Sequence, residues 1–431
     1  MGLLRGRGTL TLAASALAAG QGACSLITPL DFIGGGDGGG APADAALSAS
    51  DAAQATTDGG GPSDASSESS EGGRVASVEG GADSTGTADS ADAPACQPAT
   101  LGSDPHNCGA CGHDCLGGAC DAGACQPVML ATGLGGVQHM AIDADNLYVT
   151  RWNGSDETDG SIIQIPKNGG LSNRLTQWQV NPDGIAVDDT YVYWANFGPA
   201  SGGAGSVAKV VKSGGTATVV AAGQSSNGHG SFVVAVDGTS IYWGNYFQVM
   251  ICPLSGCSGA GSDASAGQEL STAGGVSAIA AAGGVVYWTE GDGAQVSMIA
   301  STNLGGAPTP LASGQPRPAG LALDSSFAYW TNSAGGTIYR AALGGGQSPQ
   351  LVATSRAAEG STDSLGYMAV DEANVYWIDA TAQSIMKAPK VGGPATPIVN
   401  FGGADCRDVK VDSTAVYWSC FFSGYVAKIA K

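Results

Sequence analysis

The sequence predicts an all-β fold built from repeated small sheets, and three observations lead to this expectation. Six of the eight tryptophans directly follow a tyrosine, inside a phrase of the form apolar-x-apolar-Asp-x-x-x-apolar-Tyr-Trp that returns every 41 to 49 residues. Glycine is abundant, at 70 residues, and only 13% of residues are charged, which suits strands and turns better than helices. A repeat of this length indicates a supersecondary unit that stacks on its neighbours to bury its apolar faces.

Copies of the phrase extend from residue 140 almost to the end of the chain. Six are complete, at Ile185–Trp194, Val234–Trp243, Ile279–Trp288, Leu321–Trp330, Met368–Trp377 and Val409–Trp418. A seventh, Met140–Val149, has valine in place of the tryptophan. Each phrase reads as two strands joined by a turn at the Asp, whose side chain can cap backbone N–H groups there. Six copies have this Asp, and the remaining copy has Ala282 at the same position. The turn aspartates are expected to be structural.

Two further strands complete each repeat. A third follows the phrase after a glycine-rich loop, as in Ser161–Pro166, and a fourth follows a tight turn, as in Thr216–Ala221. Four strands in about 43 residues is the size of one propeller blade. The last repeat ends after its third strand, whereas Pro127–Thr132 reads as an unpaired fourth strand. We predict a β-propeller over residues 127–431 with seven blades, or six as the alternative, closed by pairing of the N- and C-terminal strands so that no sheet edge stays open.

The first 23 residues have the features of an export signal. Arg5 and Arg7 give a positive start, and Leu10–Ala19 is apolar but too short to span a bilayer. Residues 21–24 (QGAC) resemble a bacterial lipoprotein box, in which the cysteine is lipidated and becomes the new N-terminus, although Gln21 stands where an aliphatic residue is usual. We expect a signal peptide at 1–23 and lipidation of Cys24, with ordinary signal-peptidase cleavage as the alternative.

Residues 24–95 are predicted to be a disordered tether. They consist mainly of Gly, Ala, Ser, Asp and Thr, so they cannot bury enough apolar area to offset the entropy of an ordered chain. Much of the acidity lies in this segment, and the formal net charge of the chain is −20 at pH 7. Nucleic-acid binding is excluded by this charge, because it needs a basic surface.

A cysteine-rich module is predicted at 96–126, where six of the 11 cysteines gather. In an exported chain the ten cysteines after Cys24 are expected to form disulfides: Cys96, Cys108, Cys111, Cys115, Cys120 and Cys125 in the module, then Cys252, Cys257, Cys406 and Cys420. The spacing of Cys108 and Cys111, with His106 and His113 nearby, leaves zinc as the alternative for the module. The pairing within the module stays open.

Segments such as Tyr287-Trp288-Thr289-Glu290 and Tyr329-Trp330-Thr331-Asn332 resemble the YWTD repeats of low-density-lipoprotein-receptor-type β-propellers. The resemblance covers residues 127–431. Propellers of that family have six blades. They keep an Asp two residues after the Trp, whereas the residue at this position varies in this chain, with Asn196 and Glu290 as examples. The resemblance implies recognition of protein partners through loops on one face, without catalysis.

Aromatic and arginine side chains follow the Tyr-Trp strands, in loops that should share one face of the propeller. Exposed aromatics and arginines anchor interfaces, so a ligand surface is predicted there. Its candidate residues are Arg151, Trp152, Phe197, Tyr246, Phe247, Phe421 and Phe422. The alternative is that these side chains pack beneath the loops. The tryptophans of the phrases themselves are expected to be core residues between blades.

A second candidate site lies at the central channel. Alignment of the repeats places His139, Asp183, Tyr367, Arg407 and Asp408 at the start of inner strands, where they could converge. A catalytic role would use His139 with Asp183 or Asp408 as a lyase or hydrolase site. The other interpretation is a polar channel lining in which Arg407 neutralises an acid.

These observations favour a non-enzymatic binding protein that recognises a protein or glycan at the cell surface through loops on the propeller face. A lyase or hydrolase acting at the channel mouth is the alternative, and no catalytic residue is assigned in the main interpretation. No metal or cofactor is expected. The chain is expected to be exported to the cell envelope as an outer-membrane or surface lipoprotein, otherwise secreted. We expect a monomer that meets the membrane only through a lipid anchor.

Overall fold

The computed structural model describes residues 96–152, 158–199, 205–224, 231–245, 247–257, 267–355 and 365–431. Residues Cys96–Lys431 form one compact unit. The predicted signal peptide (1–23), the predicted tether (24–95) and Cys24 lie outside the described residues. Across the described ranges, no helix has the length and apolar character needed to cross a bilayer.

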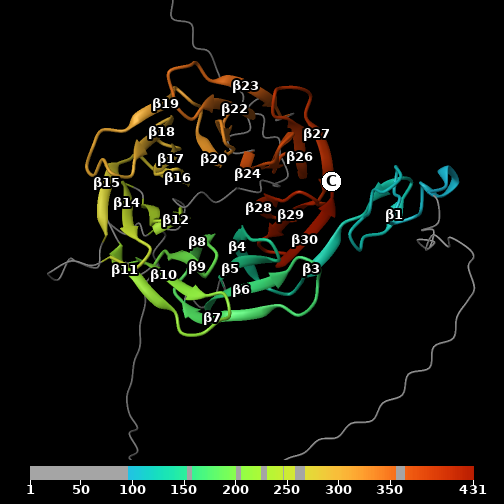
Figure 1. Ribbon diagram of the computed structural model, residues 1–431, viewed down its shortest axis with the longest axis horizontal. Coiled ribbons are helices and arrows are strands. Elements are labelled where there is room, and N and C mark those ends of the chain that lie inside the picture. Colours follow the sequence, from blue (N-terminus) through green and yellow to red (C-terminus); the bar gives the residue numbers. More distant parts are fainter. Residues whose placement is uncertain are drawn as a thin grey trace, which may run out of the picture. The chain divides into compact units, whose positions relative to one another are not determined.

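Seven four-stranded antiparallel sheets form a closed ring, which confirms the all-β propeller with seven blades; the six-bladed alternative is wrong (Figure 1). Blade by blade, from the innermost to the outermost strand, the bounds are β4 (Gly136–Ile142), β5 (Asn146–Trp152), β6 (Gly160–Pro166), β7 (Asn173–Gln179); β8 (Pro182–Val187), β9 (Tyr191–Asn196), β10 (Gly205–Val211), β11 (Thr218–Gln224); β12 (Ser231–Val236), β13 (Ser240–Asn245), β14 (Gln248–Pro253), β15 (Gln268–Thr272); β16 (Val276–Ala282), β17 (Val285–Glu290), β18 (Gln295–Ala300), β19 (Thr309–Ser313); β20 (Pro318–Leu323), β21 (Phe327–Asn332), β22 (Thr337–Ala342), β23 (Gln350–Thr354); β24 (Leu365–Val370), β25 (Asn374–Asp379), β26 (Ser384–Pro389), β27 (Thr396–Asn400); and β28 (Cys406–Val411), β29 (Ala415–Cys420), β30 (Tyr425–Ala430), β3 (Val128–Ala131).

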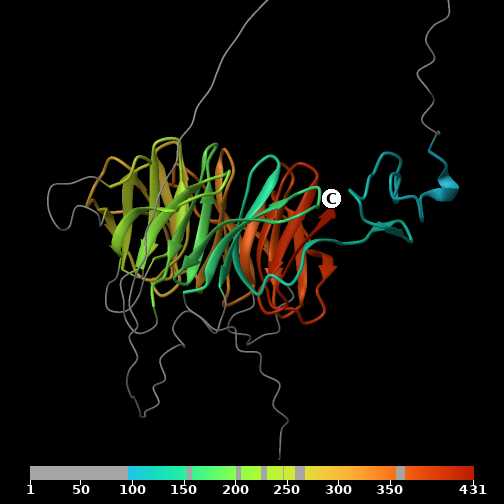
Figure 2. The ribbon, with the colours of Figure 1, turned by 90° about the horizontal axis from the view of Figure 1, so that it is seen from below.

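The inner strand of each blade contacts the inner strands of both neighbours, so the seven inner strands surround the central channel. Seen from the edge, the strands run from one face of the ring to the other (Figure 2). All inner strands begin at the same face, which also carries the loops between the second and third strands of each blade. We call this face the entry face. The Asp turns lie at the opposite face.

The ring closes as predicted. Strand β3 pairs antiparallel with β30, with Val128 opposite Lys428 and Met129 opposite Ala427. The seventh blade therefore combines three strands from the C-terminal end with one strand that precedes the first blade (Figure 1). This pairing removes the edge that β30 would otherwise expose.

The Tyr-Trp pairs are buried between blades, as predicted, with every one of these tryptophans at most 1% exposed. Three of the indole N–H groups donate to a glutamine at or just after the end of the outermost strand of the preceding blade: Trp194 to Gln179 at 3.0 Å, Trp243 to Gln224 at 2.7 Å and Trp330 to Gln315 at 3.0 Å. The indole N–H of Trp418 has no partner among the described residues. The aromatic pair thus joins neighbouring blades by packing and, at these three places, by a hydrogen bond.

Each turn aspartate joins the two strands of its phrase. In all six Asp copies one carboxylate oxygen accepts the N–H groups two and three residues later, and the other accepts the hydroxyl of the Tyr five residues later. In the copy with Ala282 the Tyr287 hydroxyl donates instead to the carbonyl of Leu343, at 3.3 Å. The structural role expected for these aspartates is confirmed.

Four of the turn aspartates also bind a lysine from the next blade, a link that sequence reasoning missed. The pairs are Lys212–Asp143, Lys390–Asp324, Lys431–Asp371 and Lys167–Asp412, at 2.5 to 2.9 Å. For Asp324, burial raises the pKa, but Lys390 and the donors of the turn hold it at about 2. Because this pKa lies below that of an unfolded Asp, about 3.9, the ionised carboxylate stabilises the fold above pH 4.

We expect Asp324→Asn to lower the free energy of unfolding by about 1–2 kcal/mol at pH 7, because the amide cannot pair with the Lys390 ammonium. The difference from wild type should shrink as the pH falls from about 4 through about 2, because the wild-type carboxylate then becomes protonated. Urea unfolding at pH 7, 4 and 2 measures it. The control is Asp145→Asn, at an exposed position; equal losses in both variants, or a loss at pH 2 as large as that at pH 7, would contradict the assignment.

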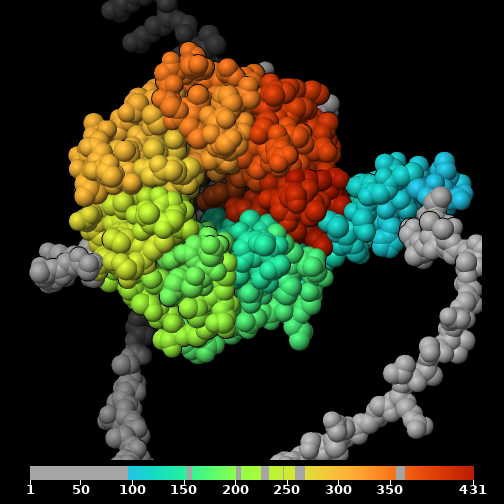
Figure 3. Space-filling view, in the orientation of Figure 1, coloured from blue at the N-terminus to red at the C-terminus, as the bar shows by residue number. Residues whose placement is uncertain are grey.

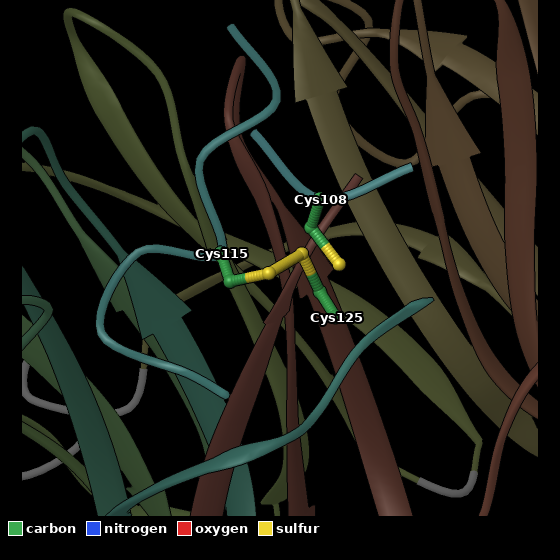
Figure 4. Close-up of side chains that lie close together, drawn as sticks. All are labelled: Cys108, Cys115 and Cys125. Carbon is green, nitrogen blue, oxygen red and sulfur yellow. A yellow bond between two sulfur atoms is a disulfide. The ribbon is translucent and has the colours of Figure 1, made fainter. Parts of the chain in front are cut away.

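The cysteine-rich module contains a short 3-10 helix η1 (Pro98–Thr100) and a hairpin of β1 (Cys120–Asp121) and β2 (Ala124–Cys125). Its disulfides are Cys96–Cys111, Cys108–Cys120 and Cys115–Cys125, and the propeller holds Cys252–Cys257 and Cys406–Cys420. The prediction that all ten of these cysteines pair is confirmed. The sulfurs of Cys108, Cys115 and Cys125 lie within 4.8 Å of one another (Figure 4). All three belong to disulfides, so they offer no thiolate to zinc.

The module packs against the seventh blade. Cys108, Cys115 and Cys125 belong to the same buried cluster as Ile429 of β30. The His113 ring lies 2.6 Å from the carbonyl oxygen of Cys108 through Nδ1 and 2.7 Å from that of Lys431 through Nε2. Hydrogen bonding and apolar contact therefore both join the module to the blade that closes the ring.

Candidate functional site

The central channel holds a cavity of about 280 Å³ that all seven inner strands line. Viewed down its axis, the propeller surface is hollowed at the centre (Figure 3). Most of the cavity wall is apolar, with side chains such as Ile185, Val234 and Leu321. The polar side chains of the wall come from β4, β24 and β28, and they gather on one side of it. A cavity with an apolar wall and few polar groups is the usual form of a ligand site.

His139 is the centre of this polar group, and its side chain is 12% exposed. Its Nε2 lies 3.0 Å from Oδ1 of Asp183 on the neighbouring blade, and its Nδ1 lies 3.7 Å from Oδ2 of Asp408 on β28. The Tyr367 ring meets the imidazole edge-to-face, with centroids 4.5 Å apart. The structure therefore brings together His139, Asp183, Tyr367 and Asp408, as the alignment of the repeats predicted.

Asp408 is the most buried carboxylate of the group, at 2% side-chain exposure. Its Oδ2 accepts the backbone N–H of Met140 at 2.8 Å, and its Oδ1 accepts the ammonium of Lys410 at 2.7 Å. Burial raises the pKa of Asp408, but the charge of Lys410 and the hydrogen bond with His139 hold it at about 2. Asp408 is thus a permanent anion that fixes the position of the imidazole.

His139 is protonated at neutral pH. Burial lowers its pKa, but the charge and hydrogen bond of Asp183, followed by those of Asp408, raise the pKa to about 9. Burial also raises the pKa of Tyr367 well above its ordinary value, and the charges of Asp183 and Asp408 act in the same direction. At pH 7 the site therefore presents an imidazolium and a phenol, both proton donors, beside two carboxylates.

Arg407 makes no hydrogen bond or ion pair with this group; as in the other interpretation it neutralises an acid, and that acid is Asp405. Its guanidinium binds the Asp405 carboxylate at 3.1 Å and the Gln138 side chain at 3.1 Å, and it lies 3.9 Å from the centre of the Phe421 ring. The cation that neutralises Asp408 is Lys410, which the prediction did not name. The signal was present in the sequence, because residues two apart on a strand face the same side.

Most of the aromatic and arginine candidates pack beneath the loops of the entry face. Arg151 pairs with Asp159 at 3.5 Å, the Trp152 ring lies 5.9 Å from that of Phe421, and Phe421 is only 6% exposed. Phe197 is partly buried against the third and fourth blades. Phe422 and Phe247 remain exposed, at 74% and 40%. Tyr246 lies outside the described residues.

Solved β-propellers are similar to this structure. A streptogramin B lyase aligns with a TM-score of 0.55 at 10% identity, over 70% of this chain and 96% of that chain. A catalytically inactive variant of virginiamycin B lyase from Staphylococcus aureus, with quinupristin, aligns at 0.54 and 11% identity over 71% and 98%. YCF48 bound to D1 peptide aligns at 0.50 and 9% identity over 71% and 94%. No family model and no curated protein matches the sequence. At these identities the similarity shows the propeller fold alone.

Proposed function

We propose that this chain is an exported binding protein whose propeller takes up part of a protein or glycan ligand at the mouth of its central channel, without catalysing a reaction. The observation that carries the proposal is the cavity, with polar groups that keep an unpaired atom in its wall or next to it. Asp183 uses Oδ1 for His139, and its Oδ2 has no partner among the described residues. The Tyr367 hydroxyl likewise has no hydrogen bond within the described ranges, and the Tyr367 side chain lines the cavity.

The charge state of the site favours binding over catalysis. Each nitrogen of His139 faces a carboxylate, and its pKa of about 9 keeps the ring protonated at neutral pH. A general base must have lost its proton at the working pH and must reach the substrate proton. His139 meets neither condition. Its role is to hold the Asp183 carboxylate in place through Oδ1, which leaves Oδ2 for a ligand. A ligand hydroxyl or ammonium would bind between that oxygen and the Tyr367 hydroxyl.

Export to the cell surface, with Cys24 as the lipid anchor, is part of this proposal. Its support is the export-like segment 1–23 together with five disulfides in the described part of the chain, since such bonds persist outside the reducing cytosol. The exposed rings of Phe422 and Phe247 would extend the ligand contact across the entry face.

The test uses the full chain on arrays of synthetic peptides and of glycans, followed by calorimetry with the strongest ligand. We expect Asp183→Asn to weaken binding at least tenfold and Tyr367→Phe about threefold to tenfold, because each removes one of the open polar groups. Asp189→Asn, the same charge change at an exposed turn of the same blade, should leave the affinity unchanged. If Asp183→Asn binds the ligand with wild-type affinity, the ligand does not bind at the channel.

A lyase or hydrolase is the second candidate, and one observation favours it. Two residues of that alternative, His139 and Asp408, line an accessible cavity, and the third, Asp183, contacts His139. A protonated His139 could act only as a general acid toward a basic leaving group. Turnover of an array ligand that is lost in the double variant His139→Gln, Asp183→Asn would establish this function; turnover that survives in it would exclude this site.

A further inference from the structure

A second groove lies on the rim of the propeller, away from the channel. It has a volume of about 510 Å³ and is lined by Arg174–Gln179, from β7, and by residues 215–217 of the next blade. The turn of that blade is held against β7, because the N–H of Gly215 donates to the carbonyl of Leu175 at 3.2 Å. Strand β7 is the outermost strand of its sheet, so the groove opens directly to solvent.

Trp178 is the large side chain of this groove, and its backbone conformation is unusual. Its φ is +63°, and 65% of the residue is exposed. The corresponding positions in two other blades are Gly223 and Gly314, with φ of +69° and +66°. The correspondence is structural, since each of these three residues precedes the glutamine that accepts an indole N–H from the next blade.

The fold does not explain a tryptophan at this position. A left-handed backbone is strained for a bulky residue and free of strain for glycine, which two other blades use. The ring makes no aromatic or cation contact among the described residues, and most of it faces solvent. A strained residue whose side chain gives the fold little in exchange is a sign of function. The first blade therefore presents an indole where its neighbours present none.

We propose that this groove binds a glycan, with a sugar ring stacked on Trp178. An exposed indole offers a flat apolar face to the C–H face of a sugar, and planar amide and guanidinium groups beside it bind hydroxyls. Arg174 and Gln177 provide these groups; they are exposed, and Nη1 of Arg174 lies 3.4 Å from Oε1 of Gln177. The groove lining contains no carboxylate, although the chain is acidic overall. A neutral or acidic sugar would therefore meet no repulsion.

The chemistry of the groove fits a sugar better than a protein. A protein hot spot needs several apolar anchors around one buried centre. Here Trp178 is the one large aromatic side chain of the lining, and the residues beside it are polar or small. The site also differs from the proposed channel site in its residues, so either site can exist without the other.

The test uses the full chain with cellohexaose, xylohexaose, chitohexaose and hexagalacturonate as probes, measured by tryptophan fluorescence and calorimetry. Six of the eight tryptophans are buried and Trp152 is partly buried, so a fluorescence change on binding reports mainly on Trp178, the most exposed indole. We expect saturable binding of at least one probe with a Kd below about 1 mM. Trp178→Gly should weaken it at least tenfold while leaving the Tm equal or higher, and Arg174→Gln should weaken it threefold or more.

Two controls separate this site from the others. Leu351→Ala removes an exposed apolar side chain from the outermost strand β23 of the fifth blade, and Val391→Ala removes one from a turn of the sixth blade; both should bind the hexasaccharide as wild type does. The proposal is overturned if no probe binds, or if Trp178→Gly retains the wild-type affinity. It is equally overturned if Trp178→Gly changes only the oligomeric state, because the groove would then be a contact between copies of the chain.

Discussion

Substituting Leu130 by aspartate is expected to open the propeller ring. Leu130 lies on β3, is 6% exposed, and belongs to a buried cluster with Val137 and Tyr417, so its side chain joins the first and seventh blades. An unpaired carboxylate there adds the cost of a buried charge to the loss of leucine packing. We expect the free energy of unfolding to fall by about 4 kcal/mol or more. Urea unfolding followed by tryptophan fluorescence measures the change.

The matched control is Met129→Asp on the same strand. Met129 is 54% exposed, so an aspartate there remains in water and should change the stability by less than about 1 kcal/mol. Separation of β3 from β30 would also free a strand edge, so Leu130→Asp should self-associate at concentrations where Met129→Asp is monodisperse. Similar stability of the two variants would mean that the ring does not depend on the closing strand.

The fold was predictable from the sequence because its main packing device repeats. Trp194 and Trp330 occupy the same place in their blades, and the period between such residues sets the blade size. The closing strand was predictable because a fourth strand was missing at one end and unpaired at the other. The salt bridges between lysines and turn aspartates of neighbouring blades could not be predicted from the sequence. Lys390 and Asp324, for example, are 66 residues apart, and only the packing of the blades brings them together.

The channel site followed partly from the same alignment. His139, Asp183 and Asp408 lie on inner strands, whose positions the repeat fixes, so their meeting was predictable. Arg407 was misplaced because its guanidinium reaches Asp405 and Gln138, and alignment of the repeats fixes the backbone position of a residue but not where a long side chain ends. The loop residues were harder still, since the burial of Phe421 depends on a loop shape that no repeat determines.

Removing the Asp408 carboxylate is expected to be the most damaging change in the channel. In Asp408→Ala the Met140 N–H and the Lys410 ammonium lose their acceptor, and His139 loses one of its two anions. Removing one partner of a buried ion pair costs about 3–5 kcal/mol of stability, because the remaining charge stays buried without a counter-charge. Asp405→Ala, which breaks the more exposed pair with Arg407, should cost less than about 1 kcal/mol.

The pH dependence distinguishes this account from a simple packing defect. The raised pKa of His139, about 9 against about 6.5 for an unfolded His, gives stability that is present below pH 6.5 and is lost as the pH rises through 9. In Asp408→Ala the pKa of His139 should fall, as histidine NMR titration would show, and the alkaline loss should shrink. Asp408→Asn keeps an acceptor for the Met140 N–H without the charge, so it should recover part of the stability but not the high pKa. An unchanged pKa of His139 in both variants would mean that Asp183 alone raises this pKa. Asp408 would then only accept the Met140 N–H and would not stabilise the charge of His139.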